Sequence, residues 1–169
     1  KEFNMNFVVK ARGDEYQYLE AVKAAQMPLL VPVNFPDAVE VEDPLDARDV
    51  SLAQMLHWEL APGNLAALHK AGLRFAVTTA DLKNPSDLWS NMRLAIEYGL
   101  PADVALEALT LAPARLFKVD QLVGSLEKGR LANFLVCSDS LFAADNEIYQ
   151  TWVAGRKYEH QAFPETVDM

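Results

Sequence analysis

The sequence of 169 residues predicts an α/β fold that continues into a smaller, strand-rich part. Up to about residue 118, short apolar runs alternate with segments whose apolar residues recur at helical spacing, which is the rhythm of β-α-β units in a parallel sheet. After Pro113 the period changes, and glycine turns separate short strand-like runs. With 51% hydrophobic and 23% charged residues, the composition is ordinary for one globular unit.

The first β-α-β unit lies near the start of the chain. The apolar run Phe7–Ala11 predicts a buried strand, and residues 15–26 predict a helix with one apolar face. A second buried strand is expected over residues 28–33, and Asn34 follows its end. Because a helix joins two strands, the strands are expected to run parallel.

The next elements follow after a polar, Pro-containing segment over residues 37–49, which predicts a loop. Ser51 is a typical N-cap residue at the start of a helix. The predicted elements are helices over residues 52–59 and 65–70, a strand over 74–79, and helices over 85–98 and 102–109.

The strand-rich part begins after the last of these helices. Residues 133–137 predict a strand, and residues 148–158 predict a two-stranded meander that turns at Gly155. We therefore divide the chain into residues 1–118, residues 119–160 and a frayed tail over residues 161–169.

Three motifs stand in a fixed order between Asn91 and Tyr158. They are A-L-x-A-L-T-x-x-P-A, then G-S-L-E-K-G-R-L-A-N-F-L-V, then T-W-V-A-G-R-K-Y. This order resembles the C-terminal end of amidohydrolase-superfamily enzymes, the imidazolonepropionase-like and dipeptidase-like metal hydrolases. The resemblance implies the C-terminal portion of a (β/α)8 TIM-like barrel, about strands six to eight, plus strands of a small composite β-sandwich. It also implies hydrolysis of amide or cyclic C–N bonds by metal-activated water, with zinc or another divalent metal in the full-length family member.

The length limits how much of such a protein is present. A complete (β/α)8 barrel needs about 250 residues, and the chain opens at Lys1 without an initiator methionine or a signal-peptide pattern. We expect a C-terminal piece that is inactive alone and associates with the missing N-terminal barrel half or with another copy of the chain, because open strand edges favour pairing. The expected substrate is a small-molecule amide.

The formal charge of −9 argues against nucleic acid as a partner, because no basic stripe faces a phosphate backbone. No apolar run reaches the roughly 20 residues that span a bilayer, so no membrane partner is expected. The compartment does not follow from the sequence.

Functional groups of parallel β/α barrels lie after the carboxyl ends of the strands. In the resembled family, the eighth strand ends in a carboxylate that binds zinc or activates the attacking water, and Asp81 stands at that position. The resemblance therefore implies Asp81 as both the catalytic residue and a metal ligand. The alternative is that Asp81 only caps the loop before Asn84-Pro85.

Lys10 stands where the family places a metal-binding histidine at the end of the sixth strand. A protonated amine has no lone pair to offer a metal, and its charge repels a dication. Three roles remain open for Lys10: an ionic partner of Asp81 in an emptied metal site, a group that binds a substrate anion, or a surface lysine. The first role favours a rival function, a catalytically degenerate module that binds a ligand or serves packing.

Asn34 is a further candidate for substrate binding, because its amide can hydrogen-bond a carbonyl group, although a turn-forming asparagine is the alternative. The three histidines, His57, His69 and His160, fit structural roles, and no His-x-His motif is present.

Overall fold

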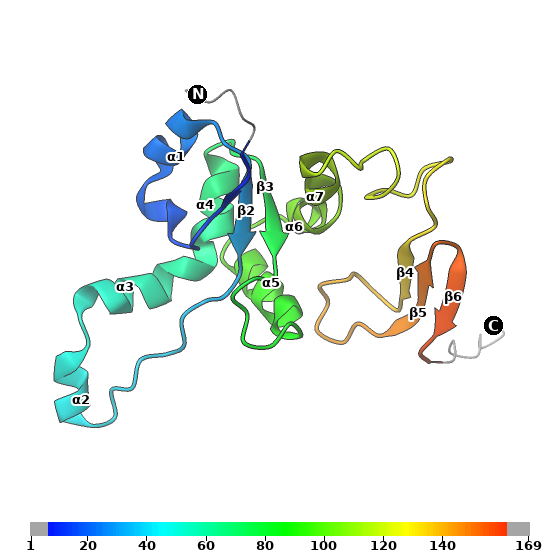
Figure 1. The fold of residues 1–169 in the computed structure, drawn as a ribbon. Helices are drawn as coiled ribbons and strands as arrows, with labels where there is room; N and C mark the ends of the chain where they lie inside the picture. Colours follow the sequence, from blue (N-terminus) through cyan, green and yellow to red (C-terminus); the bar gives the residue numbers. More distant parts are fainter. Residues whose placement is uncertain (1–6, 162–169) are drawn as a thin grey trace.

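The computed structural model describes residues 7–161, except for the side chains of residues 44 and 46, and contains two three-stranded sheets with helices between them (Figure 1). In chain order the elements are β1 (Val9–Lys10), η1 (Glu15–Gln17), α1 (Leu19–Ala25), β2 (Leu29–Pro32), α2 (Pro44–Asp49), α3 (Leu52–Leu60), η2 (Ala61–Gly63), α4 (Asn64–Lys70), β3 (Phe75–Thr78), α5 (Asp87–Glu97), α6 (Ala102–Leu109), α7 (Leu111–Leu116), β4 (Phe134–Cys137), β5 (Ile148–Val153) and β6 (Arg156–Glu159). Here η denotes a 3-10 helix.

The first sheet has the strand order β1-β2-β3, and both pairings are parallel. Val9 pairs with Leu29 at the start of the sheet, and Pro32 pairs with Thr78 at its end. Because all three strands run in one direction, their carboxyl ends lie along one edge, which we call the rim. The predicted parallel β-α-β arrangement is confirmed.

The hydrophobic core lies between the first sheet and the helices that follow its strands. Strand β2 is buried along most of its length, and α4, α5 and α6 pack against the same cluster. The largest apolar side chains that are almost fully buried are Val31, Val33, Leu65, Leu68, Met92 and Leu100. This cluster fixes the sheet against α4 and thereby fixes the rim.

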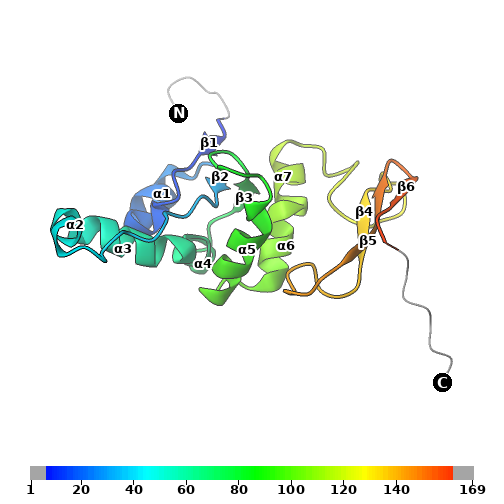
Figure 2. The ribbon, with the colours of Figure 1, turned by 90° about the horizontal axis from the view of Figure 1, so that it is seen from below.

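The second sheet is antiparallel, with the order β4-β5-β6. Helices α6 and α7 lie between the two sheets in both ribbon views (Figures 1 and 2). Phe134 on β4 stacks on Trp152 of β5, with ring centroids 5.3 Å apart. The three predicted strands are confirmed. No residue from 119 to 161 is buried, and the described residues supply no second layer for a sandwich.

Three expectations about local structure are wrong. The first strand is two residues long, and Phe7 and Val8 are exposed, because β1 has a neighbour on one side only. The predicted helix over residues 15–26 is divided at Tyr18 into η1 and α1. The predicted loop contains α2, which begins because the Asp43 side chain accepts a hydrogen bond from the Leu45 amide.

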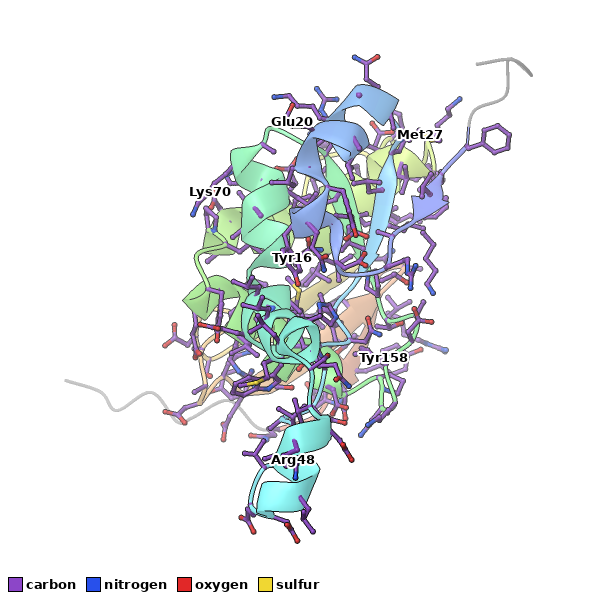
Figure 3. The ribbon with its side chains drawn as sticks, turned by 90° about the vertical axis from the view of Figure 1, so that its left-hand side faces the viewer. Tyr16, Glu20, Met27, Arg48, Lys70 and Tyr158 are labelled. Atoms are coloured by element: carbon purple, nitrogen blue, oxygen red, sulfur yellow. The ribbon has the colours of Figure 1, made fainter. Side chains whose placement is uncertain are left out.

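Helices α2 and α3 form an arm that projects away from the first sheet, on the side opposite to the second sheet (Figures 1 and 2). Ser51 is the N-cap of α3 and forms a capping box with Gln54. The Ser51 hydroxyl accepts a hydrogen bond from the backbone amide of Gln54, and the side-chain oxygen of Gln54 accepts one from the backbone amide of Ser51. The predicted N-cap is confirmed. Arg48 lies on α2, near the far end of the arm (Figure 3). The predicted frayed tail falls outside the described residues, except for Gln161.

Candidate functional site at the rim of the parallel sheet

The rim carries the three residues that the sequence analysis selected. Lys10 ends β1, Asn34 follows β2 by two residues, and Asp81 follows β3 by three residues. These three residues lie at the same edge because β1, β2 and β3 are parallel, so the chain leaves the sheet at that edge after each strand.

Lys10 and Asp81 form an ion pair, in which the Lys10 Nζ donates to Asp81 Oδ2. The Lys10 side chain is 49% exposed and that of Asp81 is 45% exposed, so water reaches both groups. Asp81 has a φ of 72°, in the left-handed region, and the turn before it is fixed by the Ala80 amide, which donates to Thr78 Oγ1 over 3.1 Å. The ion pair required by the first of the three roles left open for Lys10 is present.

This contact bears on the three roles left open for Lys10. Lys10 is exposed as well as paired, so the surface-lysine role also fits the geometry. The ionic-partner role fits it directly. A role in binding a substrate anion requires the substrate to share or displace Asp81.

Asn34 is exposed and follows β2, the strand between β1 and β3. Its Oδ1 would lie 4.0 Å from a Cβ atom added at Gly13, so the amide faces the turn that follows β1. The structure gives the Asn34 side chain no hydrogen bond within residues 7–161, which leaves its amide available to a ligand. The backbone before it is anchored, because Asn91 Nδ2 donates to the Val33 carbonyl over 2.7 Å.

A second ion pair joins the loops that follow β2 and β3. Lys83 Nζ donates to Asp37 Oδ2 over 2.6 Å, and both side chains are largely exposed. The hydrogen bond from Lys83, together with its charge, holds the pKa of the Asp37 carboxyl below its ordinary value of 3.8. The same contact raises the pKa of Lys83 above 10.5.

A buried polar network lies behind the rim, and no pattern in the sequence predicts it. Glu15 is buried and accepts hydrogen bonds from the Arg12 amide, the Gly13 amide and Asn64 Nδ2. Asn64 is also buried, and its Oδ1 accepts from the Tyr16 amide over 2.8 Å. Glu15 and Asn64 are 49 residues apart, and no local pattern in the sequence signals such a contact.

The Tyr16 side chain extends this network toward the arm. Its hydroxyl lies 3.0 Å from His57 Nδ1, and the two rings stack with centroids 6.2 Å apart. Figure 3 shows Tyr16 beside the end of α3. His160 lies elsewhere, with Nε2 2.9 Å from Thr151 Oγ1. Both contacts are consistent with structural roles for these two histidines.

The described residues do not form a metal site on their own. Within residues 7–161, no group of three or more His, Cys, Asp or Glu side chains is placed to hold a metal ion. At the rim, Asp81 offers one carboxylate, and Lys10 already binds it. Any metal bound here would need further ligands from outside this set.

None of the helices in the described part of the chain is both long and apolar enough to cross a bilayer.

Comparison with known proteins identifies the family. The sequence model of the amidohydrolase family matches residues 62–157, which is more than half of the chain. The chain belongs to the amidohydrolase family. The match begins before β3 and ends in β6, so it includes Asp81 and most of the second sheet.

Curated relatives of this amidohydrolase chain are adenine deaminases. Adenine deaminase 2 of Jannaschia sp. (strain CCS1) is 35% identical over 133 residues, which cover 70% of this chain and 20% of the relative. Adenine deaminase 2 of Bradyrhizobium diazoefficiens is 45% identical over 100 residues, which cover 56% of this chain and 15% of the relative. The chain thus spans about a fifth or less of the length of these relatives.

Solved structures show the same amidohydrolase fold. An amidohydrolase from Thermotoga maritima MSB8 superposes with a TM-score of 0.70 at 19% identity, covering 94% of this chain and 38% of that one. A molinate hydrolase superposes with a TM-score of 0.56 at 18% identity, covering 90% of this chain and 39% of that one. Members of the amidohydrolase family hydrolyse C–N bonds in general and generally use a divalent metal such as zinc.

Proposed function

We propose that β1, β2 and β3 are strands six to eight of an amidohydrolase barrel, and that residues 119–160 belong to a composite β-sandwich. The parallel order β1-β2-β3 supports this assignment, as does the antiparallel sheet that follows α7. The similarity in fold to the Thermotoga maritima amidohydrolase, which extends over 94% of this chain, is consistent with the same assignment.

The complete protein, in this proposal, hydrolyses an amide or cyclic C–N bond, and Asp81 is the catalytic carboxylate. The observation that carries it is the place of Asp81, on the rim of a parallel sheet and half exposed to solvent. Asp81 accepts a proton from the attacking water as the C–O bond forms. It then returns the proton to the leaving nitrogen as the C–N bond breaks.

Lys10 and Asn34 serve the substrate in this scheme. The Lys10 ammonium group holds the Asp81 carboxylate in one orientation until substrate arrives, and then binds a developing negative charge. The exposed Asn34 amide donates to a substrate carbonyl from the neighbouring strand end. A divalent metal would activate the attacking water, with Asp81 as a ligand from the described residues and the other ligands from a longer protein or a partner.

The test uses the full-length protein. It is incubated with adenine, a cyclic amide and a dipeptide, and the release of ammonia or amine is followed, while bound metal is measured by mass spectrometry. Adenine is included because the curated relatives are adenine deaminases. We expect turnover of at least one compound, and Asp81→Asn should lower it by about a hundredfold or more.

Asp37→Asn is the matched control, because Asp37 is also an exposed, paired carboxylate on a loop after the rim, but on no proposed reaction path. Turnover that survives in Asp81→Asn would refute the catalytic assignment.

The ion pair itself favours a second function, a degenerate amidohydrolase module with a structural or ligand-binding role. An ammonium group bound to Asp81 supplies the charge balance that a metal would otherwise supply. Absence of both bound metal and turnover in the full-length protein would favour this second function over the first.

We further propose that the chain associates with the rest of a barrel or with another copy of itself. Large apolar side chains are exposed on the arm and before β1, and β1 has an open edge. The most exposed of these side chains are Leu45, Leu52, Phe7, Met55 and Trp58. A single monomeric species in light scattering of the 169-residue chain at high concentration would contradict association.

A further inference from the structure

The turn that follows β1 is held by a buried carboxylate. Glu15 Oε1 accepts from the Arg12 amide over 2.6 Å, and both Glu15 oxygens lie 3.2 Å from the Gly13 amide nitrogen. Glu15 Oε2 also accepts from Asn64 Nδ2 over 2.8 Å. A buried carboxylate that receives several N–H donors is a strong anchor, because hydrogen bonds to a charged group are stronger than neutral ones.

Strand β1 needs such an anchor. It is two residues long and, among residues 7–161, pairs on one side only. Its ends are tied to β2 by the Val9 amide, which donates to the Pro28 carbonyl over 3.0 Å, and by the Ala11 amide, which donates to the Leu30 carbonyl over 2.8 Å. The next backbone amides along the chain are the two that Glu15 binds. The position of Lys10 therefore depends on the sheet from one side and on Glu15 from the other.

Asn64 connects this turn to the core. It is 1% exposed and begins α4, whose Leu65, Ala66 and Leu68 side chains are buried in the core cluster. The network therefore relates the end of β1 to a helix that packs within the same core as β2 and β3. Lys10 is therefore held relative to the same hydrophobic core that holds β3, the strand that precedes Asp81.

We propose that Glu15, fixed by Asn64, is a positioning residue that keeps the Lys10 ammonium group against the Asp81 carboxylate. The inference rests on the proposed function of the rim and deepens it, because it assigns the buried residues that preorganise that site. Glu15 hydrogen-bonds neither Lys10 nor Asp81 and acts through the backbone of residues 11–13.

The hydrogen-bond pattern makes the proposal testable with nearly isosteric changes. Backbone donors stand at both ends of the Glu15–Asn64 pair, at Arg12 and Gly13 on one side and at Tyr16 on the other. Residue 15 must therefore offer an acceptor to the Arg12 and Gly13 amides, and residue 64 must offer an acceptor to the Tyr16 amide. Between the two side chains, one must donate a hydrogen bond and the other must accept it. In Glu15→Gln, the side-chain amides at positions 15 and 64 cannot meet these requirements together. Whichever way each side-chain amide is turned, one NH2 group faces another N–H donor.

The readout is the acylation rate of Lys10 by an amine-reactive ester, measured by mass spectrometry under native conditions. Lys70 serves as the internal reference, because it is exposed and has no ion pair within the described residues (Figure 3). Release of Lys10 from Asp81 should raise the ratio of Lys10 to Lys70 labelling by about two- to fivefold in Glu15→Gln. Asp81→Asn sets the upper limit of this rise. Asn64→Ala, which keeps the carboxylate but frees it from α4, should give a smaller rise.

The double variant Glu15→Gln with Asn64→Asp restores the pattern with the same net charge. The side-chain oxygen at position 15 then accepts from the Arg12 and Gly13 amides, and the side-chain nitrogen there donates to one carboxylate oxygen at position 64. The other carboxylate oxygen accepts from the Tyr16 amide. The labelling ratio should return to the wild-type value. Met92→Ala, which opens a cavity at a core residue that takes no part in this hydrogen-bond network, should lower stability and leave the ratio unchanged.

An unchanged ratio in both Glu15→Gln and Asn64→Ala would overturn the proposal, as would a double variant that regains stability without regaining the ratio. The assay needs no substrate and no metal. Its outcome is therefore independent of whether the full-length protein hydrolyses any compound, and the failure of one proposal is distinguishable from the failure of the other.

Discussion

Gly124 lies where the chain leaves α7 for the second sheet, and its replacement by alanine tests how closely this turn is packed. A Cβ atom at this position would lie 2.8 Å from the Ala114 Cβ, 3.1 Å from the Thr110 carbonyl oxygen and 3.3 Å from the Leu111 Cα. Two of these three atoms belong to the backbone, so they cannot move aside as the end of a side chain can. The φ of Gly124 is 97°, which a residue with a side chain rarely adopts.

Gly129 supplies a matched control in the same segment. Its φ is 95°, and a Cβ atom added there meets no atom within 4 Å. Both substitutions carry the same backbone strain, about 1–3 kcal/mol, and both gain about 0.4–1 kcal/mol from a stiffer unfolded chain. Only Gly124→Ala adds the cost of overpacking, about 1–3 kcal/mol. We therefore expect a loss of about 1–2 kcal/mol for Gly129→Ala and about 2–5 kcal/mol for Gly124→Ala.

The assay is urea unfolding followed by far-ultraviolet circular dichroism, with the free energy of unfolding obtained by linear extrapolation. The slope of that free energy against urea should be the same for both variants, so that the difference in midpoint reports stability alone. Equal losses for Gly124→Ala and Gly129→Ala would refute the reasoning, because the packing of Gly124 against α7 would then contribute nothing.

Two further predictions concern the charged pairs at the rim. Because water reaches both Lys10 and Asp81, Asp81→Asn should change the free energy of unfolding by less than about 1 kcal/mol, and a larger loss in urea unfolding would mean that the pair is a structural anchor. Lys83→Met should raise the pKa of Asp37 back toward 3.8, as followed by carbon-13 NMR titration. The contact with Lys83 lowers the pKa of Asp37 in the folded chain. The contribution of this ion pair to stability is therefore fully present above the pKa that Asp37 has in the unfolded chain, and it is lost as the pH falls through the pKa of Asp37 in the folded chain. An Asp37 titration that does not change in Lys83→Met would contradict this cause.

Local signals in the sequence are sufficient for much of the fold. Ser51 carries the capping side chain, and Gln54 three residues later completes the box, so the start of α3 is predictable. The apolar run before Asp81 identifies β3, because buried parallel strands are apolar on both faces. By contrast, the polar composition of residues 37–49 predicts a loop where α2 forms, although Asp43 followed by a proline is a typical helix start.

The rim is predictable only in part. The positions of Lys10 and Asp81 follow from the strand ends, and their contact follows from opposite charges brought to one edge. The Glu15–Asn64 network does not follow, because it depends on how α4 packs behind the turn after β1. Such contacts join residues far apart in the chain, and neither periodicity nor capping records them.

The Lys10–Asp81 bridge joins the two outer strands of a three-stranded sheet across the strand between them, over a separation of 71 residues. Its closure therefore requires that both outer strands have already docked on the central one. During refolding from urea, protection of the Lys10 amine would mark the moment at which the whole sheet is assembled, later than any signal from helices that form within a single stretch of chain. The reactivity of the Lys10 amine thus reports when the three strands have come together.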